Sequence, residues 1–331
     1  MTHDHSFKPL TRRQAMLGLA AAAGLGVHAD LLAQAAGSVV KFILPVSAGS
    51  GVDGIARAAS GQLAVALGTS VVIENQPGAG GVVGTSAMVK AAPDGQVLSM
   101  VSNNHVIYPS VLKSVPFDPV NDITPITIIG ATPLVLVVNP SVPANNMKEF
   151  VALLKANPGK YNFGSSGNGT ILHLAAEMFK DVTGTFSTHI PYRGFGPMLG
   201  DIVGGQVHWG VGALPAVKGQ LDAGRVRAIC VSAPQRIPAA PNIPTAVEQG
   251  YPAYLVEGWI AAVGPKGMSP ELVKRLHTAF VTAFNTQEVK DAMAKQGNTI
   301  SLTTPEAALA HFKTEMVKYA ALVKKANVVP Q

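Results

Sequence analysis

Residues 39–53, Val-Val-Lys-Phe-Ile-Leu-Pro-Val-Ser-Ala-Gly-Ser-Gly-Val-Asp, decide the fold of this chain. Residues 39–44 are mostly apolar, with β-branched and aromatic side chains, and they predict a buried strand. Pro45 cannot donate a hydrogen bond to a sheet, so the strand ends there. The small residues 47–51 indicate a turn, and apolar residues at helical spacing follow from Asp53 onward. The resulting strand, glycine-containing loop and helix present free backbone N–H groups to an anion.

The same order of elements returns later in the chain. Residues 161–163 are strand-like, 164–170 form a loop rich in Gly and Ser, and 171–182 are helical. Strands that alternate with helices predict parallel sheets, and open α/β sheets bind ligands at the carboxyl ends of their strands. We therefore expect an α/β protein in which the two loops face each other across a cleft. Further strands are expected at 71–74, 97–101, 134–138, 207–211, 226–231 and 255–263.

Composition restricts the class of protein. The 331 residues suffice for two cores, and a charged fraction of only 13% favours buried parallel strands over disorder. The formal net charge is +6, but no Lys/Arg cluster stands out, so a nucleic-acid partner is not implied. Cys230 is the single cysteine, which excludes an internal disulfide, and its apolar surroundings predict an inert core thiol.

The first 35 residues read as a signal peptide. Arg12-Arg13 precedes an apolar run at 17–27, and Ala33-Gln34-Ala35 fits a small-residue cleavage site. The run is too short to span a bilayer. The paired arginines indicate the twin-arginine route, whereas Ala15-Met16 replaces the usual Phe-Leu, so general secretion stays open as the alternative. We expect a periplasmic protein cleaved near Ala35.

One motif favours a different function. Residues 49–54 match the dinucleotide fingerprint G-x-G-x-x-G, and Glu74 lies roughly 20 residues further on, where a ribose-binding acid would sit. An exported NAD(P)-dependent oxidoreductase is therefore the alternative function. Against it, residues 45–48 lengthen a turn that should be tight, and a second Gly-rich loop at 75–81 has no role in that fold.

Other signs of catalysis or metal binding are weak. The sequence has no H-E-x-x-H and no Cys cluster, and residues 164–167 are not a G-x-S-x-G elbow. We predict no catalytic residue, no metal and no cofactor. Asp53 is interpreted either as a helix cap or as the group that orients the first loop. Ser165 and Thr170 could donate hydroxyls to a carboxylate or serve a plain turn, and Arg193 could pair with a carboxylate or lie on the surface.

Taken together, these segments resemble the Bug family, also called TctC, which comprises periplasmic solute-binding proteins of tripartite tricarboxylate transporters. The resemblance covers almost all of residues 39–328. Its matching stretches are Pro45…Gly49…Asp53, Glu74-Asn75-Gln76-Pro77-Gly78-Ala79-Gly80-Gly81, Pro93-Asp94-Gly95, Phe117-Asp118-Pro119, Tyr161…Gly164-Ser165…His173, Pro191-Tyr192-Arg193-Gly194, Asp201…Gly204-Gly205-Gln206-Val207, Pro241…Pro244-Thr245…Gly250-Tyr251-Pro252 and Trp259.

The resemblance implies a two-lobed periplasmic-binding-protein-like fold of type II, with a cleft that closes on a small organic carboxylate. Lobe 1 is expected to comprise residues 36–138 and 259–331, and lobe 2 residues 139–258. The implied partners are the membrane subunits of a tripartite tricarboxylate transporter, and the protein is expected to be a monomer and not an enzyme. Carried over by matching position, the ligand-binding residues are Pro45, Ser47, Ala48, Gly49, Asp53, Ser102 and Asn103 in lobe 1, and Ser165, Gly167, Thr170 and Arg193 in lobe 2.

Two positions depart from the family pattern. His208 stands where many members have Asp or Asn, and Gly212 where many have Asp. Gly212 ends the strand at 207–211, and we expect it to point into the cleft and offer no partner to an ammonium. The site is then predicted to prefer a carboxylate without an amine; alternatively, Gly212 only marks a strand end or a close backbone approach. Trp209 and Tyr192 are candidates to wall an aromatic ligand, or else they pack within lobe 2.

Overall fold

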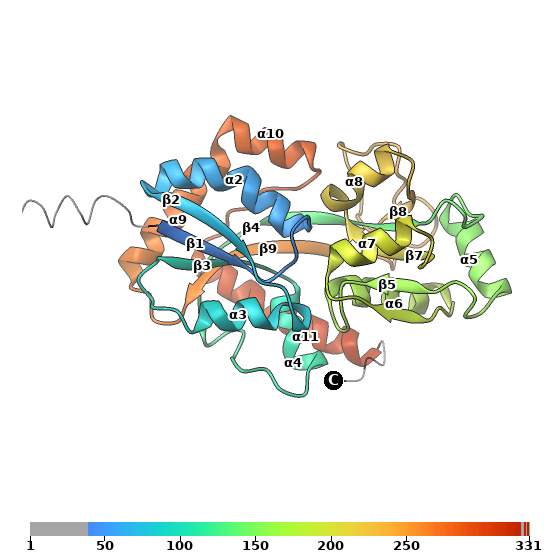
Figure 1. The fold of residues 1–331 in the computed structure, drawn as a ribbon, viewed down its shortest axis with the longest axis horizontal. Coiled ribbons are helices and arrows are strands. Elements are labelled where there is room, and N and C mark those ends of the chain that lie inside the picture. Colours follow the sequence, from blue (N-terminus) through green and yellow to red (C-terminus); the bar gives the residue numbers. More distant parts are fainter. Residues whose placement is uncertain (1–38, 326–327, 329, 331) are drawn as a thin grey trace, which may run out of the picture. The chain divides into compact units, whose positions relative to one another are not determined.

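The computed structural model describes residues 39–325, 328 and 330 (Figure 1). The residues from Val40 onward form one compact unit, which is described here. The predicted signal peptide at 1–35 lies outside the described residues. In the part of the chain that is described, no helix combines the length and apolar character needed to cross a membrane.

Helices and strands alternate through most of this unit, as the sequence predicts. The strands are β1 (Val39–Leu44), β2 (Ser70–Asn75), β3 (Val97–Ser102), β4 (Ile123–Val138), β5 (Phe163–Ser165), β6 (His189–Pro191), β7 (Trp209–Ala213), β8 (Arg227–Val231) and β9 (Glu257–Pro265). The helices are α2 (Gly51–Leu67), the 3-10 turn η1 (Ala79–Gly81), α3 (Val82–Val89), α4 (Asn104–Val111), α5 (Met147–Ala156), α6 (Ile171–Thr183), α7 (Phe195–Val203), α8 (Leu214–Asp222), α9 (Pro270–Asn285), α10 (Gln287–Lys295) and α11 (Pro305–Lys325).

The strands form one mixed, open sheet in the order β2-β1-β3-β9-β4-β7-β5-β6, with β8 paired to β4. The predicted parallel pairing occurs between β1 and β3, and between β5 and both β6 and β7. β9 and β4 instead run antiparallel to each other and to their other neighbours. The reason is their path: β4 carries the chain from lobe 1 into lobe 2 and β9 carries it back, side by side (Figure 1).

The change of partner within β4 marks the junction of the two lobes. Residues 123–133 pair with β9, whereas Leu134–Val138 pair with β7 and β8. Pro133 has no N–H, so the ladder loses a donor at this point. The strand pairing of β4 thus changes a few residues before the lobe boundary expected at 138/139, and β9 starts at Glu257, close to the boundary expected at 258/259. The lobe boundaries at 138/139 and 258/259 stay a prediction.

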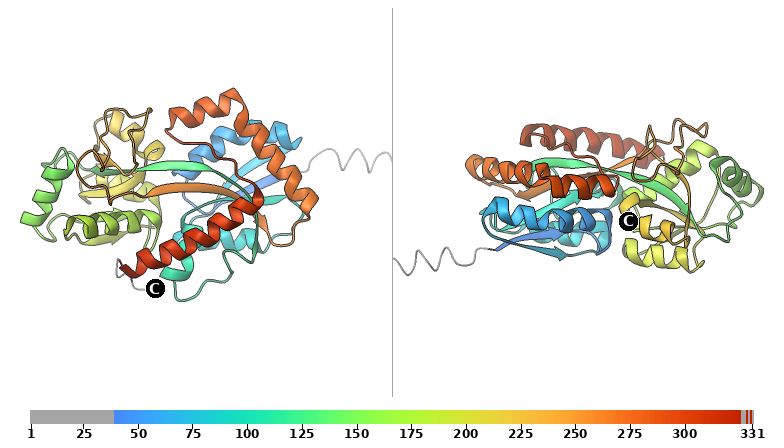
Figure 2. Two further views of the ribbon diagram at one scale, coloured as in Figure 1. Left: turned by 180° about the vertical axis from the view of Figure 1, so that it is seen from behind. Right: turned by 90° about the horizontal axis from the view of Figure 1, so that it is seen from above.

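Lobe 1 is closed by the C-terminal helices. α9 packs on α2 and β4, and α10 packs on α2, while α11 packs on α4 and β4 (Figure 2). The core between them is continuous: Ile55 and Leu63 of α2 are fully buried with Phe280 and Phe284 of α9. The packing of α9 and α10 on α2 holds that helix, and with it the first loop, in place.

The single cysteine is part of the core, as the sequence predicts. Cys230 is buried within β8, and burial raises the pKa of its thiol to about 12.

Candidate functional site

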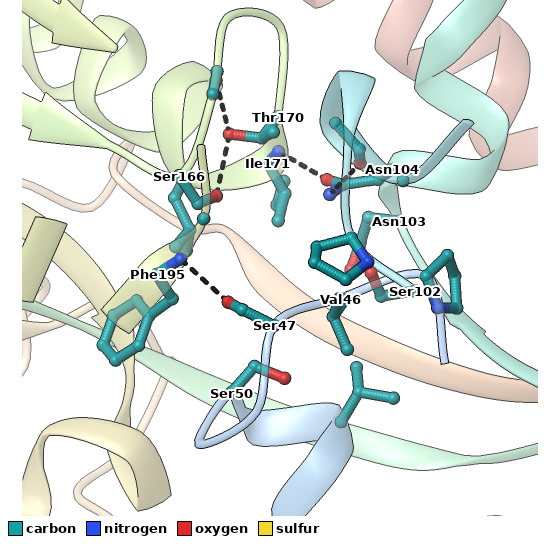
Figure 3. A pocket seen from close by; sticks show the side chains of 18 of the residues that line it. Val46, Ser47, Ser50, Ser102, Asn103, Asn104, Ser166, Thr170, Ile171 and Phe195 are labelled. Atoms are coloured by element: carbon teal, nitrogen blue, oxygen red, sulfur yellow. Dashed lines mark hydrogen bonds between the residues drawn. The ribbon is translucent and has the colours of Figure 1, made fainter. Parts of the chain in front are cut away.

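A pocket of about 670 Å³ lies where the loops of the two lobes meet (Figure 3). From lobe 1 it takes the loop after β1, the loop before α3 and the end of β3. From lobe 2 it takes the loop between β5 and α6 and the start of α7. The crossing strands β4 and β9 also contribute. The described residues that line it are Pro45, Val46, Ser47, Ser50, Gly51, Val52, Pro77, Gly78, Ala79, Gly80, Gly81, Ser102, Asn103, Asn104, Leu112, Thr132, Leu134, Ser166, Gly167, Asn168, Thr170, Ile171, Leu172, Pro191, Tyr192, Arg193, Gly194, Phe195, Ala213, Ala216, Gly258, Trp259 and Ile260.

Asp53, in the first turn of α2, anchors the first loop through hydrogen bonds. It is only 4% exposed, and its two carboxylate oxygens accept hydrogen bonds from Gly49 N–H at 2.9 Å, Arg57 Nε at 2.9 Å and Asn75 Nδ2 at 3.0 Å. Burial alone would raise the pKa of Asp53, but these hydrogen bonds prevail and lower the pKa below its usual value. Ser50 caps α2, with Oγ accepting from Asp53 N–H at 3.3 Å. Asp53 therefore serves both the helix start and the loop.

The loop before α3 contributes mainly backbone. Gly78, Ala79, Gly80 and Gly81 all have positive φ, at 129°, 46°, 70° and 120°. A Cβ on Gly81 would lie 2.8 Å from the carbonyl oxygen of Pro45, so only glycine allows the two loops to touch. The dinucleotide interpretation leaves this loop without a role, whereas here it forms one wall of the pocket.

In lobe 2, hydroxyl groups shape the loop before α6. Thr170 is the N-cap of α6; its Oγ1 donates to Gly167 O at 2.8 Å and accepts from Ser166 Oγ at 3.2 Å (Figure 3). Ser165 is fully buried beneath, with Oγ 3.0 Å from Gly167 O and 2.6 Å from His189 Nε2. His189 stacks on His173 with ring centroids 3.8 Å apart. Burial, together with His173, lowers the pKa of His189 to about 3.

Two hydrogen bonds join the lobes across the pocket. Ser47 Oγ accepts from Phe195 N–H at 3.2 Å, and Asn104 Oδ1 accepts from Ile171 N–H at 2.8 Å (Figure 3). A Cβ added to Gly51 would lie 2.9 Å from Cβ of Ala213, so the first turn of α2 touches the end of β7. The structure is therefore closed around the pocket.

The floor of the pocket is tied to the last helix. Asn103 is buried; its Oδ1 accepts from Trp259 N–H at 2.9 Å, and its Nδ2 donates to Tyr319 Oη at 2.6 Å. The indole Nε1–H of Trp259 donates to Glu315 Oε2 at 3.0 Å. Burial raises the pKa of Tyr319, which keeps this phenol neutral. Asn103 thus connects β3, β9 and α11.

The lining is apolar and nearly free of charge. Among its described residues Arg193 is the one charged side chain, and the structure gives that exposed guanidinium no hydrogen bond or ion pair with the described residues. In the same part of the chain, no group of three or more His, Cys, Asp or Glu side chains could hold a metal ion. Favourable contacts for an anion therefore come from backbone N–H groups, hydroxyls and Arg193.

The structure brings together seven of the predicted site residues in the pocket lining and places five outside it. Ala48 and Gly49 belong to the first loop but do not line the pocket, Asp53 binds that loop from the first turn of α2, Ser165 is buried at the base of the second loop, and Gly212 lies inside lobe 2. In the pocket lining are Pro45, Ser47, Ser102, Asn103, Gly167, Thr170 and Arg193.

Gly212 does not point into the pocket as expected. A Cβ there would lie 2.6 Å from Val217 Cγ1 and 2.8 Å from Phe195 Cε2, inside lobe 2. The adjacent Ala213 lines the pocket instead, because successive residues of a strand face opposite sides. The alternative interpretation of Gly212, a close approach, describes its surroundings better.

Of the two aromatic residues expected to wall the pocket, Tyr192 lines it and Trp209 does not. Trp209 is fully buried among Phe150, Phe163 and Phe179, so it packs within lobe 2 and does not wall the pocket. Tyr192 lines the pocket, with its hydroxyl donating to Asp201 at 2.6 Å.

Several lining residues were not predicted, among them Ser50, Asn104, Thr132 and the loop at 77–81. The glycines of that loop were a visible signal, since they separate a strand from a helix in the same way as the first loop. Thr132 gives no such signal, because it lies inside a long apolar strand.

Comparison with known proteins agrees with this architecture. Residues 55–328 match the family described as tripartite tricarboxylate transporter family receptor, TctC. Protein BugT of Bordetella pertussis is 32% identical over 319 residues, which are 96% of this chain and 98% of BugT.

Two solved structures with bound ligands have the same fold. R. palustris Rpa4515 with adipate has a TM-score of 0.85 and 28% identity, covering 88% of this chain and 98% of that one. MatC from Rhodopseudomonas palustris with bound malate has a TM-score of 0.81 and 25% identity, covering 86% and 98%. The family predicted from the sequence and the two-lobed α/β fold are both confirmed: this chain belongs to the Bug/TctC family of tripartite tricarboxylate transporter receptors, a family of periplasmic solute-binding proteins.

Proposed function

We propose that this protein captures a small organic carboxylate in the periplasm and delivers it to the membrane subunits of a tripartite tricarboxylate transporter. The observation that carries the proposal is the pocket itself: glycine-rich loops from both lobes surround it, and Arg193 is the one charge among its described lining residues. Such a site suits an anion with an apolar body. Adipate and malate, the ligands bound in the two related structures, are both small organic carboxylates without an amine.

The ligand is a carboxylate without an amine. This preference does not need Gly212, because the described lining contains no Asp or Glu that could pair with an ammonium. A buried ammonium without a partner is costly. Dicarboxylates, tricarboxylates and aromatic acids therefore remain the candidate ligands, and aspartate and glutamate are expected to bind more weakly.

The NAD(P)-dependent oxidoreductase is less well supported. Glu74, the acid that would hold a ribose, pairs with Lys41 at 2.7 Å and lies outside the pocket lining. The loop at 77–81, which the dinucleotide fold does not use, lines the pocket. We propose that the protein is not an enzyme and works as a monomer.

Ligand binding is tested by thermal shift and calorimetry on the mature protein. The panel contains succinate, malate, adipate, citrate and terephthalate. Aspartate and glutamate are added to test for amino-acid binding, and NAD(H) and NADP(H) to test for the oxidoreductase. At least one plain carboxylate is expected to stabilise the protein and bind more tightly than either amino acid. A thermal shift with a nicotinamide cofactor alone would favour the oxidoreductase.

We propose export through the segment at 1–35, with cleavage after Ala35. Replacing Arg12 and Arg13 by Lys should block export if the route is twin-arginine. Normal export of that variant would indicate the general secretory route. Fractionation of cells that express the full chain distinguishes the two results.

A further inference from the structure

Thr132 is an unpredicted polar residue at the junction of the lobes. It lies on β4, pairs with Gly258 of β9, and precedes by two residues Leu134, where β4 starts to pair with β7. The side chain is only 6% exposed, yet its Oγ1 has no hydrogen-bond partner among the described residues. Buried hydroxyls are normally paired, so this one calls for an explanation.

The Thr132 hydroxyl lies beside the start of α2. A Cβ built on Gly51 would lie 3.9 Å from Thr132 Oγ1, whereas a Cβ built on Gly258 would lie 2.6 Å from Thr132 Cγ2. The methyl group therefore packs on β9 and the hydroxyl is directed to the first turn of α2. Thr132, Ser50, Gly51 and Val52 all line the pocket.

Two backbone donors lie in that first turn. Asp53 N–H donates to Ser50 Oγ, and Gly54 N–H to Ser50 O, as expected for a capped helix. The N–H groups of Gly51 and Val52 have no acceptor among the described residues. Because α2 runs for 17 residues, its N-terminus also carries the positive end of a full helix dipole.

We propose that Thr132 is a ligand-binding residue: its hydroxyl and the N–H groups of Gly51 and Val52 together hold the carboxylate head group of the ligand. A carboxylate accepts hydrogen bonds from all three donors, which an ammonium cannot do. The inference rests on the proposed function and deepens it, because it fixes the head group at the strand that passes between the lobes. The rest of the ligand then extends along the apolar lining.

Three variants separate binding from stability. Thr132→Val keeps the shape but removes the hydroxyl, Thr132→Ser keeps the hydroxyl, and Thr127→Val is the matched control. Thr127 is a fully buried threonine of the same strand outside the pocket lining, and its Oγ1 donates to Thr303 O at 2.9 Å.

Thr132→Val should weaken the binding of the tightest carboxylate of the panel by about 10- to 100-fold, since one hydrogen bond to a charged group is lost. Its melting temperature without ligand should stay the same or rise, because an unpaired buried hydroxyl is gone. Thr132→Ser should stay within about threefold of the wild-type affinity, whereas Thr127→Val should melt earlier and bind normally. A Thr132→Val protein that melts earlier and binds as tightly as wild type overturns the inference.

A second measurement uses acetate, the smallest carboxylate probe, and does not depend on the panel. Acetate should shift the backbone amide resonances of Gly51 and Val52 in the wild-type protein, and shift them less in Thr132→Val. If acetate leaves both amides unchanged in the wild type, the inference fails, even if a panel carboxylate binds and the proposed function holds. If acetate shifts them while no panel member binds, the head-group site stands and the choice of carboxylates is wrong.

Discussion

The Oδ1 of Asn104 accepts a hydrogen bond from the backbone N–H of Ile171 at 2.8 Å, so a side chain of lobe 1 serves the first turn of a helix in lobe 2. Ser47 and Phe195 repeat this relationship at α7, whose own N-cap, Gly194, offers no side chain. Free N–H groups at helix starts need acceptors. The closed arrangement of the two lobes therefore completes two helices that each lobe alone would leave incomplete.

We expect Asn104→Ala to favour an open form. Losing one helix-capping bond costs about 1 kcal/mol, which is about a fivefold change in the ratio of closed to open protein. Solution scattering should report a larger radius of gyration without ligand, and calorimetry a weaker affinity. Asn146→Ala is the matched control, because Asn146 caps α5 away from the pocket. Equal radii for Asn104→Ala and Asn146→Ala would contradict the role of Asn104 in closure.

Gly51→Ala should obstruct closure directly. Its new Cβ would lie 2.9 Å from Cβ of Ala213, closer than ordinary carbon contacts allow. We expect weaker ligand binding and a more open ligand-free protein. The control is Gly61→Ala in the same helix, where nothing lies within 4 Å. That control should gain roughly 0.5–1 kcal/mol of unfolding free energy in urea titrations and bind normally. Similar affinities for the two variants would speak against the contact.

Asp53→Ala should release the first loop. Because Asp53 anchors Gly49, Arg57 and Asn75, we expect about 2 kcal/mol lower unfolding free energy and a weaker ligand affinity. The lowered pKa gives stability that is complete above the unfolded value of 3.8 and lost as pH falls through the folded pKa. Urea unfolding of Asp53→Ala should therefore lose less stability on acidification than the wild type.

The control for Asp53 is Thr286→Ala, which removes the N-cap of α10. It should lower stability without affecting the pocket. If Asp53→Ala retains full affinity while its stability falls by about 1 kcal/mol, Asp53 is a cap only.

His189 should remain neutral in the folded protein through the physiological range. Burial, and the stacked His173, lower its pKa to about 3, whereas in the unfolded chain the imidazole takes up a proton near the ordinary histidine pKa of 6.5. The folded state binds fewer protons between these values, so stability falls as pH drops from about 6.5 toward 3. His189→Phe should lose less stability over that interval. Carbon chemical shifts of the imidazole give the direct reading, and a ring that titrates near pH 6.5 would refute the prediction.

Local chemistry made much of the fold and part of the site predictable. Pro45 and Thr170 stand at strand and helix ends that the sequence marks with proline, glycine and hydroxyl residues, and both line the pocket. The side of the sheet that each strand residue faces was harder to predict. Gly212 and Ser165 are each one residue away from a lining residue, Ala213 and Ser166, because a shift of one position reverses the side of the sheet.

Long-range pairing could not be predicted from the sequence. The antiparallel pair of β4 and β9 joins residues more than a hundred positions apart, and their apolar sequences carry no mark of direction. Thr132 becomes part of the pocket only through this pairing and through the approach of α2. The lobe boundaries expected at 138/139 and 258/259 came with the family resemblance, whereas the strand pairing of β4 changes between Pro133 and Leu134, inside a largely apolar segment.

Two residues of the pocket lining form hydrogen bonds with α11: Asn103 with Tyr319, and Trp259 with Glu315. Tyr319 and Glu315 lie on the buried side of that helix, so hydrogen bonds connect α11 directly to the pocket lining although it is far from Asn103 in the sequence. Val317, which lies between Glu315 and Tyr319 in the sequence, is 71% exposed. A fluorophore attached there would stand outside the pocket, and any movement of α11 that accompanies closure would change its surroundings, which is the basis of a reagentless sensor.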